Sequence, residues 1–252
     1  LEATIKDNTA MIYIETPSNP LLKVSDIKAI VEIAKKHNIK TVVDNTFMTA
    51  LYQKPLDLGC DIVIESLTKF VNGHSDVTAG CAVTNNKEIA DEICLLQKNF
   101  GGILGVEDAW LILRGMKTMG LRMEKSVENA KILTKFLETQ DKIKKVYYPN
   151  LTSCKFYDIH TEQASSGGAV FSFEFFEQDD LKTFLKKIKI PIYAISLGGV
   201  ESIISHPATM SHACMSEEER LAQGITQTLL RFSCGVEDAE DLIEDLTQAL
   251  TD

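Results

Sequence analysis

The chain has 252 residues, of which 44% are hydrophobic and 25% are charged. These values are typical of a globular protein and exclude wholesale disorder and fibrous repeats, and no apolar run approaches the ~20 residues of a membrane-spanning helix. The formal net charge is -10. Phosphate backbones and anionic lipid repel such a chain, so we expect neither nucleic acid nor a membrane as partner.

The first half of the chain alternates short apolar runs with amphipathic helical patterns. The runs predict strands at residues 11–15, 41–44, 61–65 and 81–84. Between the first two, Ser25 is the expected N-cap of a helix that ends near His37. This alternation predicts an α/β fold with a parallel or mostly parallel sheet covered on both faces.

The second half begins with helical patterns and then alternates again. Helices are expected from Lys87 onward and at 106–116, 121–139, 181–188 and 238–250; strands are expected at 146–148, 169–175 and 229–233. Ser216 and Glu219 form the capping box of one more helix. We predict two domains, residues 1–118 and 119–252, the second being a smaller α+β domain.

Several chemical signatures are absent, and the cysteines indicate the compartment. The chain has no G-x-G-x-x-G, no P-loop and no G-x-S-x-G motif, and its five histidines lack metal-ligand spacing, so no metal is expected. Six scattered cysteines without a C-x-x-C pair favour reduced thiols of a cytoplasmic protein, and no signal peptide is visible. The first residue is Leu1, which indicates either processing or a piece of a longer chain.

Two polar residues follow neighbouring strands at the edge where open α/β sheets bind ligands. Lys69 lies between hydroxyl residues after the 61–65 strand, and Ser66 and Thr68 can donate to a phosphate. Partial burial would lower the amine pKa and make a Schiff base feasible, although a solvated lysine is the simpler interpretation.

Asp44 ends the preceding strand, so both side chains could reach one pocket. A buried carboxylate there needs a cationic partner, and the protonated pyridinium of pyridoxal 5′-phosphate (PLP) is one candidate. The alternative is an aspartate that caps the turn after it. Together, the lysine and the aspartate favour a PLP site.

Five motifs resemble the Cys/Met-metabolism family of PLP-dependent enzymes, in order and along the whole chain. They are E-T-P-S-N-P at 15–20, V-V-D-N-T-F at 42–47, S-L-T-K-F-V-N-G-H-S-D at 66–76, S-L-G-G-V-E-S at 196–202 and L-L-R-F-S-C-G at 229–235. The family includes cystathionine γ-synthase, cystathionine β- and γ-lyases and methionine γ-lyase. The resemblance implies the aspartate-aminotransferase-like fold (fold type I), with residues 1–118 as part of its large PLP-binding domain.

The resemblance also implies roles for the matching residues. Lys69 would bind PLP covalently and then shuttle protons, and Asp44 would keep the pyridinium protonated. Ser66 and Thr68 would bind the cofactor phosphate, and Thr46 would line the pocket behind the ring. Asn19 would lie beside the phenolic oxygen of the cofactor and the substrate carboxylate. Ser196 would position the lysine or the substrate, and Arg231 would bind the substrate α-carboxylate, which suits its guanidinium. A surface arginine is the alternative for Arg231.

The resemblance implies a homodimer or homotetramer with shared active sites. It also implies a further N-terminal portion, which in the family carries a Gly-rich phosphate cup and a tyrosine that stacks on the cofactor ring. We expect that portion to be missing here. An inactive, non-catalytic piece without the phosphate cup therefore remains an alternative. Leu67 stands where many members have a small residue, which we expect to be tolerated.

Position 195 bears on the choice of reaction. Enzymes with γ-chemistry on cystathionine often have Glu before S-L-G-G, whereas this chain has Ile195, which resembles β-lyases and methionine γ-lyases. The stretch 205–213 looks more like the cystathionine enzymes. We therefore expect a carbon–sulfur lyase that cleaves cystathionine to homocysteine, pyruvate and ammonia; γ-lyase, methionine γ-lyase and cystathionine γ-synthase activities remain alternatives.

Overall fold

The first sheet occupies the first third of the chain. The structure, a computed structural model, describes residues 1–251. The strands are β1 (Met11–Glu15), β2 (Lys40–Asp44), β3 (Ile62–Glu65) and β4 (Cys81–Val83), in the order β1-β2-β3-β4. The first two pairs are parallel and the β3–β4 pair is antiparallel. The expected α/β fold with a mostly parallel sheet is therefore confirmed.

Helix α1 (Ile27–Lys36) covers one face of this sheet with Ile27, Val31 and Ala34. Its N-cap is Asp26, whose carboxylate accepts from the N–H of Ala29 at 2.9 Å. The prediction of Ser25 as N-cap was wrong by one residue, because the side chain of Asp26 is the one that accepts from the first turn of the helix. A carboxylate at this position also complements the positive end of the helix dipole.

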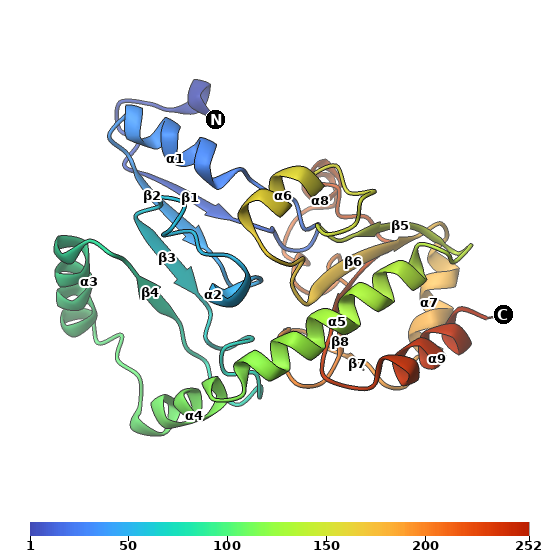
Figure 1. The fold of residues 1–252 in the computed structure, drawn as a ribbon. Helices are drawn as coiled ribbons and strands as arrows, with labels where there is room; N and C mark the ends of the chain where they lie inside the picture. The colour runs from blue at the N-terminus through green and yellow to red at the C-terminus, as the bar shows by residue number, and fades with distance from the viewer. Residues whose placement is uncertain (252) are drawn as a thin grey trace.

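The opposite face of the first sheet differs from the expectation. Met11 and Tyr13 remain 50% and 53% exposed. Helix α3 (Lys87–Phe100) lies beyond the β4 edge instead of on the face, and none of its residues is buried (Figure 1). Within residues 1–251, the sheet is thus covered on one face and not on both.

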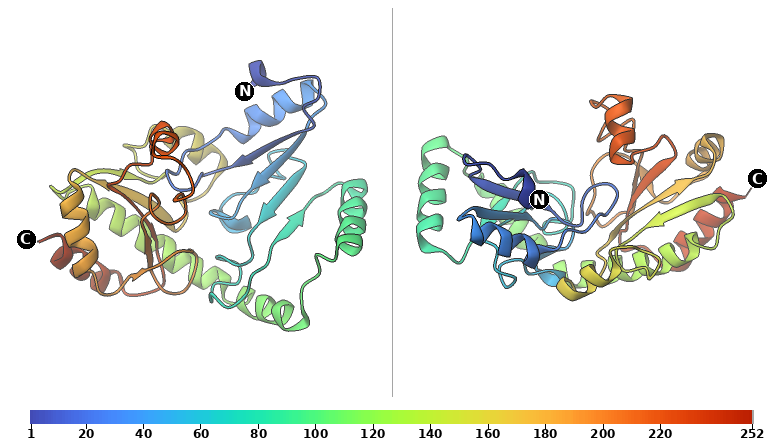
Figure 2. Two further views of the ribbon diagram at one scale, coloured as in Figure 1. Left: turned by 180° about the vertical axis from the view of Figure 1, so that it is seen from behind. Right: turned by 90° about the horizontal axis from the view of Figure 1, so that it is seen from above.

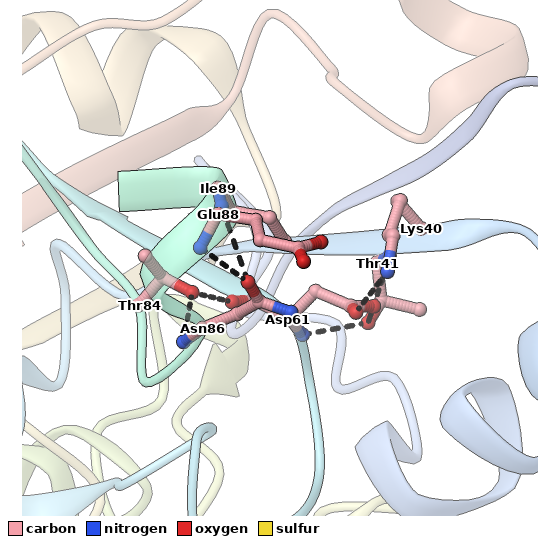
Figure 3. A network of polar contacts seen from close by, with 7 residues as sticks. All are labelled: Lys40, Thr41, Asp61, Thr84, Asn86, Glu88 and Ile89. Carbon is pink, nitrogen blue, oxygen red and sulfur yellow. Dashed lines mark hydrogen bonds and ion pairs between the residues drawn. The ribbon is translucent and has the colours of Figure 1, made fainter. Parts of the chain in front are cut away.

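A polar network at the amino ends of β2 and β3 fixes their register (Figure 3). One Asp61 carboxylate oxygen accepts from both the N–H and the hydroxyl of Thr41, at 2.9 Å each, and the other accepts from Lys40 at 3.1 Å. The Asp61 carbonyl accepts from the Thr84 hydroxyl at 2.7 Å, and Asn86 then caps α3. The network therefore joins both strands to the start of α3.

Replacing Asp61 by alanine should lower the free energy of unfolding by about 2 kcal/mol at pH 7, because the two Thr41 donors lose a charged acceptor. Burial raises the pKa of Asp61, but the Thr41 hydrogen bonds and the Lys40 ammonium outweigh it, so the folded-state pKa is lowered. The stabilisation is therefore present above the unfolded-state pKa of about 4 and is lost as pH falls through the folded-state value. Urea denaturation at pH 7 and in acid tests this. Asp7→Ala, at an exposed turn, is the control; equal losses in the two variants would contradict the prediction.

The second sheet lies beside the first and is mostly antiparallel. Its order is β5-β6-β9-β8-β7, with only β7–β8 parallel. The strands are β5 (Ile143–Tyr147), β6 (Val170–Phe175), β7 (Ile192–Tyr193), β8 (Ile203–Ser205) and β9 (Leu229–Ser233). This arrangement agrees with the α+β character expected for the second half.

The remaining helices are mostly those the sequence predicts. They are α2 (Thr49–Tyr52), α4 (Val106–Met116), α5 (Met119–Leu137), α6 (Tyr157–Gln163), α7 (Gln178–Lys187), α8 (Glu217–Gln223) and α9 (Ala239–Leu250), and a short 3-10 turn spans Glu2–Thr4. The capping box of Ser216 and Glu219 is present at α8. Strands β7 and β8 and helices α2 and α6 escaped prediction because each is too short to show a period. Among residues 1–251, no helix is both long and apolar enough to cross a bilayer.

One large apolar cluster forms the core of the second half, and a smaller one joins the two halves. The larger packs Phe171, Phe173 and Phe232 of the second sheet against α5, α7 and α9. A smaller one joins Phe47 and Phe70 of the first half to residues of α5 and β6. Figures 1 and 2 show α5 running along the second sheet, with the carboxyl ends of β1 to β3 directed toward that sheet.

Candidate active site

A cavity of about 470 Å³ lies at the carboxyl ends of β1 and β2, where the first sheet faces β8 and β9. It contains eight of the nine site residues that the sequence predicts: Asn19, Asp44, Thr46, Ser66, Lys69, Ile195, Ser196 and Arg231. The ninth, Thr68, does not line it. The fold thus brings together residues up to 212 positions apart in the chain.

Lys69 lines this cavity and is held there by a hydrogen bond. Its Nζ donates to the Ser196 hydroxyl at 2.9 Å. Burial, and then the charge of Arg231, lower the pKa of the Lys69 amine, since both disfavour the ammonium form. Lys69 is thus partly buried and hydrogen-bonded within the cavity, which favours the interpretation as a reactive amine over that of a solvated lysine.

The segment that carries Ser196 approaches Lys69 by an unusual backbone path. Ser196 has φ 86° and Gly198 has φ 82°. This left-handed region costs a residue with a Cβ about 1–2 kcal/mol, a cost that glycine avoids. A Cβ on Gly198 would lie 2.7 Å from the N of Phe70 and 3.0 Å from the carbonyl carbon of Lys69. Glycine at 198 therefore lets this segment pack directly on the lysine backbone.

Replacing Gly198 by alanine should destabilise the protein by about 2–4 kcal/mol, because strain and backbone overlap add. The displaced lysine should also bind PLP more weakly. Thermal unfolding and PLP titration would measure the two effects. Gly102→Ala is the control, since a Cβ there meets no atom within 4 Å. A Gly198→Ala variant that behaves like this control would disprove the close approach.

Arg231 occupies the middle of β9 and is only 4% exposed, so it is not a surface arginine. Its guanidinium donates to the Asn19 side-chain oxygen at 2.9 Å and to the Ser196 carbonyl at 2.7 Å. Burial lowers the pKa of Arg231 to about 10, and the Glu15 carboxylate acts in the opposite direction. The cation is thus fixed in place with capacity for an anionic ligand.

Asp44 caps the turn after it and also lines the cavity, while its pairing with a pyridinium stays a prediction. One carboxylate oxygen accepts from the Thr46 N–H at 3.0 Å, which closes the turn, and the other accepts from the Tyr13 hydroxyl at 3.1 Å. The side chain also lines the cavity. Each carboxylate oxygen has two acceptor sites, so a further cationic donor can still be bound.

The two predicted phosphate-binding hydroxyls are placed differently. Ser66 lines the cavity, and its N–H donates to the Thr46 hydroxyl at 2.9 Å. The Thr68 hydroxyl donates to the Ala79 carbonyl at 3.1 Å and accepts from the Ala79 N–H at 2.9 Å. Thr68 therefore closes the 68–79 loop, and its contact with a phosphate stays a prediction.

Sequence reasoning missed some residues of the cavity: Glu15, Phe47, Leu197, Ser205, Met210 and Ser211. Glu15 follows the same rule as Asp44, because it ends a parallel strand at the ligand edge. Burial raises the pKa of Glu15, although its carboxylate accepts from the Asn19 N–H at 2.8 Å. Ser205 ends β8, which was not predicted.

The donor set fits PLP. A primary amine with a lowered pKa can bind the carbonyl, a carboxylate can pair with the pyridinium, and a hydroxyl at Ser66 can reach the phosphate. Two buried atoms beside the cavity, the Ser205 hydroxyl and the Arg231 Nε, have no hydrogen-bond partner among residues 1–251. Such unpaired polar atoms are costly, which is consistent with a polar ligand in the cavity.

Comparisons with known proteins agree with this geometry. The chain is 49% identical over 247 residues to cystathionine beta-lyase MetC of Bacillus subtilis, and 46% identical over 250 residues to cystathionine gamma-lyase of the same organism. These matches cover 98% and 99% of this chain but 63% and 66% of those relatives. The chain thus spans about two thirds of their length.

Solved structures give the same result. The crystal structure of cystathionine gamma-lyase from Lactobacillus plantarum complexed with L-serine superposes with a TM-score of 0.96 at 40% identity, covering 98% of this chain and 65% of that one. The model of the Cys/Met metabolism PLP-dependent enzymes matches residues 1–251. The chain therefore belongs to the Cys/Met-metabolism family of PLP-dependent enzymes.

Proposed function

We propose that this protein is a PLP-dependent carbon–sulfur lyase that cleaves cystathionine by β-elimination to homocysteine, pyruvate and ammonia. One observation carries the proposal: the Lys69 amine and the Arg231 guanidinium meet at Ser196, one on its hydroxyl and the other on its carbonyl. An amine that moves protons thereby lies beside a cation that binds a carboxylate, as elimination from an α-amino acid requires.

Four residues of the cavity, Lys69, Ser196, Arg231 and Asn19, act on the substrate in this reaction. PLP, when bound, supplies an electron sink for the electrons of the broken Cα–H bond. Lys69, with its lowered pKa, takes the α-proton and can deliver a proton to the leaving sulfur. Ser196 orients the amine, and Arg231 with Asn19 holds the α-carboxylate so that the Cα–H bond faces Lys69.

Ile195 supports β-elimination over γ-chemistry. Ile195 is 69% exposed at the cavity and adds no acid or base there. γ-Elimination and γ-replacement need a second proton removed at the β-carbon. Glu15 favours those alternatives, because a half-buried carboxyl with a raised pKa lies in the same cavity. Cystathionine γ-lyase, methionine γ-lyase and cystathionine γ-synthase activities are therefore second candidates.

Product analysis separates these activities. With PLP and cystathionine, the expected products are homocysteine and pyruvate in equal amounts. Cysteine and 2-oxobutanoate would instead identify γ-elimination, and cystathionine formed from activated homoserine and cysteine would identify the synthase. If no product forms and no PLP adduct is found on Lys69, the non-catalytic alternative holds.

We further propose the organisation of the working protein. Residues 1–118 and 119–252 form two domains, consistent with the start of α5 at Met119. The protein acts in the cytoplasm as a homodimer or homotetramer with shared active sites. Exposed apolar residues along α3 and α4 support an assembly: Leu95, Leu96, Phe100, Val106, Trp110 and Leu113. Light scattering after gel filtration tests it, and a monomer at micromolar concentration would refute it.

A further inference from the structure

A second cavity, of about 360 Å³, lies outside the active site. It is bounded by residues 21–23, strand β5, residues 153–156 and the carboxyl-terminal end of α8, and it shares no lining residue with the active-site cavity. Its volume falls within the range of about 300–1,000 Å³ that is usual for small-molecule sites. Its size therefore suits a compact organic ligand.

The walls of this second cavity are largely apolar. Leu21, Leu22 and Tyr148 are 8%, 2% and 1% exposed and form its buried side. Phe156 lines it as well, and Leu221 of α8 is 52% exposed at its edge. An apolar ligand body would cover the water-exposed apolar surface of Phe156 and Leu221, which is favourable.

The charges of the second cavity are all of one sign. Its lining includes Lys23, Lys145 and Lys155 but no Asp or Glu, in a chain of net charge -10. Within residues 1–251, no carboxylate forms an ion pair with any of these three lysines. The cavity is therefore a local positive site on an acidic protein.

The three ammonium groups are held at the cavity by neighbouring groups. Lys145 Nζ lies 4.8 Å from the ring centroid of Tyr147, and Lys155 Nζ lies 4.7 Å from that of Phe156. Lys23 Nζ donates to the Gln223 carbonyl at 2.8 Å. An ammonium group has three N–H donors, and a cation–π contact does not pair them with acceptor atoms. These donors therefore remain available to an anion.

Glu174 is a buried carboxylate that is hydrogen-bonded to Tyr147 of the cavity wall, and it has donors of its own. Glu174 accepts from the Tyr147 hydroxyl at 3.1 Å, from Lys144 at 3.2 Å and from Thr226 at 2.9 Å. It does not line the second cavity. Its charge is therefore satisfied by these donors, and the three cavity lysines lack a partner of opposite sign.

We propose that the second cavity binds a small amphipathic organic carboxylate, with its apolar body against Leu21 and Phe156 and its carboxylate among the lysines. Residues 21–23 lie two positions beyond Asn19 of the active site. The bound carboxylate therefore contacts the segment that carries Asn19, while leaving the active-site cavity open.

Calorimetric titration of the full-length, PLP-loaded protein with octanoate tests the proposal, and octan-1-ol serves as the uncharged probe of equal length. Octanoate should bind at least about tenfold more tightly than octanol, since a partly shielded ion pair increases affinity by about that factor. The double variant Lys145→Gln/Lys155→Gln should lose that advantage. Lys28→Gln/Lys36→Gln on α1, with the same change in net charge, should keep octanoate affinity within about twofold.

A second pair of variants covers the case in which the double variant fails to fold. Leu221→Glu places a negative charge at the cavity edge and should weaken octanoate binding about tenfold, whereas Leu221→Gln should change it little. The proposal is overturned if octanoate does not bind, if octanol binds equally well, or if neither the lysine pair nor Leu221→Glu weakens octanoate more than its control does.

Discussion

Replacing Lys69 by arginine should lower kcat/KM for cystathionine by about 10⁴-fold or more. Arginine keeps the positive charge but provides neither a nucleophilic amine nor a base near neutral pH, since its pKa exceeds about 12. The Ser196 hydroxyl would then orient a group that cannot take the α-proton. Steady-state production of pyruvate and homocysteine measures the loss, and Lys98→Arg on exposed α3 should retain parental activity.

Chemical trapping provides the independent readout for Lys69. Borohydride reduction of the PLP-treated protein, followed by peptide mass spectrometry, should give a phosphopyridoxyl adduct on Lys69 and none at that position in Lys69→Arg. Adducts spread over surface lysines would mean that the cavity does not bind PLP. An active Lys69→Arg protein would refute the assigned role directly.

Replacing Arg231 by glutamine should lower kcat/KM by about 10²–10³-fold, mainly through KM. The substrate carboxylate loses a charged, two-pronged donor, and hydrogen bonds of this kind contribute about 1.5–3 kcal/mol each. Arg231→Lys should recover only part of the loss, because an ammonium group cannot contact Asn19, the Ser196 carbonyl and a carboxylate with the same geometry.

Arg231 also has a predicted effect on pH dependence. Its charge contributes to the lowered pKa of Lys69. Removing that charge should raise the Lys69 pKa, so less of the amine is in the basic form at a given pH, and the acid limb of the kcat profile should move to higher pH. Arg114→Gln, on the exposed side of α4, should leave the profile unchanged.

A pair of ligands separates carboxylate binding from general damage to the site. Alanine carries the α-carboxylate and ethylamine lacks it, while both present an amine. The Arg231→Gln variant should bind alanine at least about tenfold more weakly and ethylamine unchanged. Equal losses for both ligands would show that Arg231 acts only by holding Asn19 and Ser196 in place.

The sequence by itself determined the elements whose cause is local. Strand β9 and helix α4 have the predicted bounds, and the α8 capping box is present, because side-chain period and capping act within a few residues. The motifs around Asp44, Lys69 and Arg231 indicated the family and PLP. Polar residues that end parallel strands also predicted the ligand edge, and Glu15 could have been found by the same rule.

Tertiary structure decided what depends on contacts between distant segments. Arg231 meets Asn19 across 212 positions and the Ser196 carbonyl across 35. The Thr68 hydroxyl is hydrogen-bonded to the Ala79 backbone, and no local sequence pattern predicts this contact. The short strand β8 pairs with β9, and β7 pairs with β8 in turn, so both depend on segments distant in the chain. Buried donors and acceptors must find hydrogen-bond partners, and these partners come from distant segments. Their positions are therefore set only when the whole chain has folded.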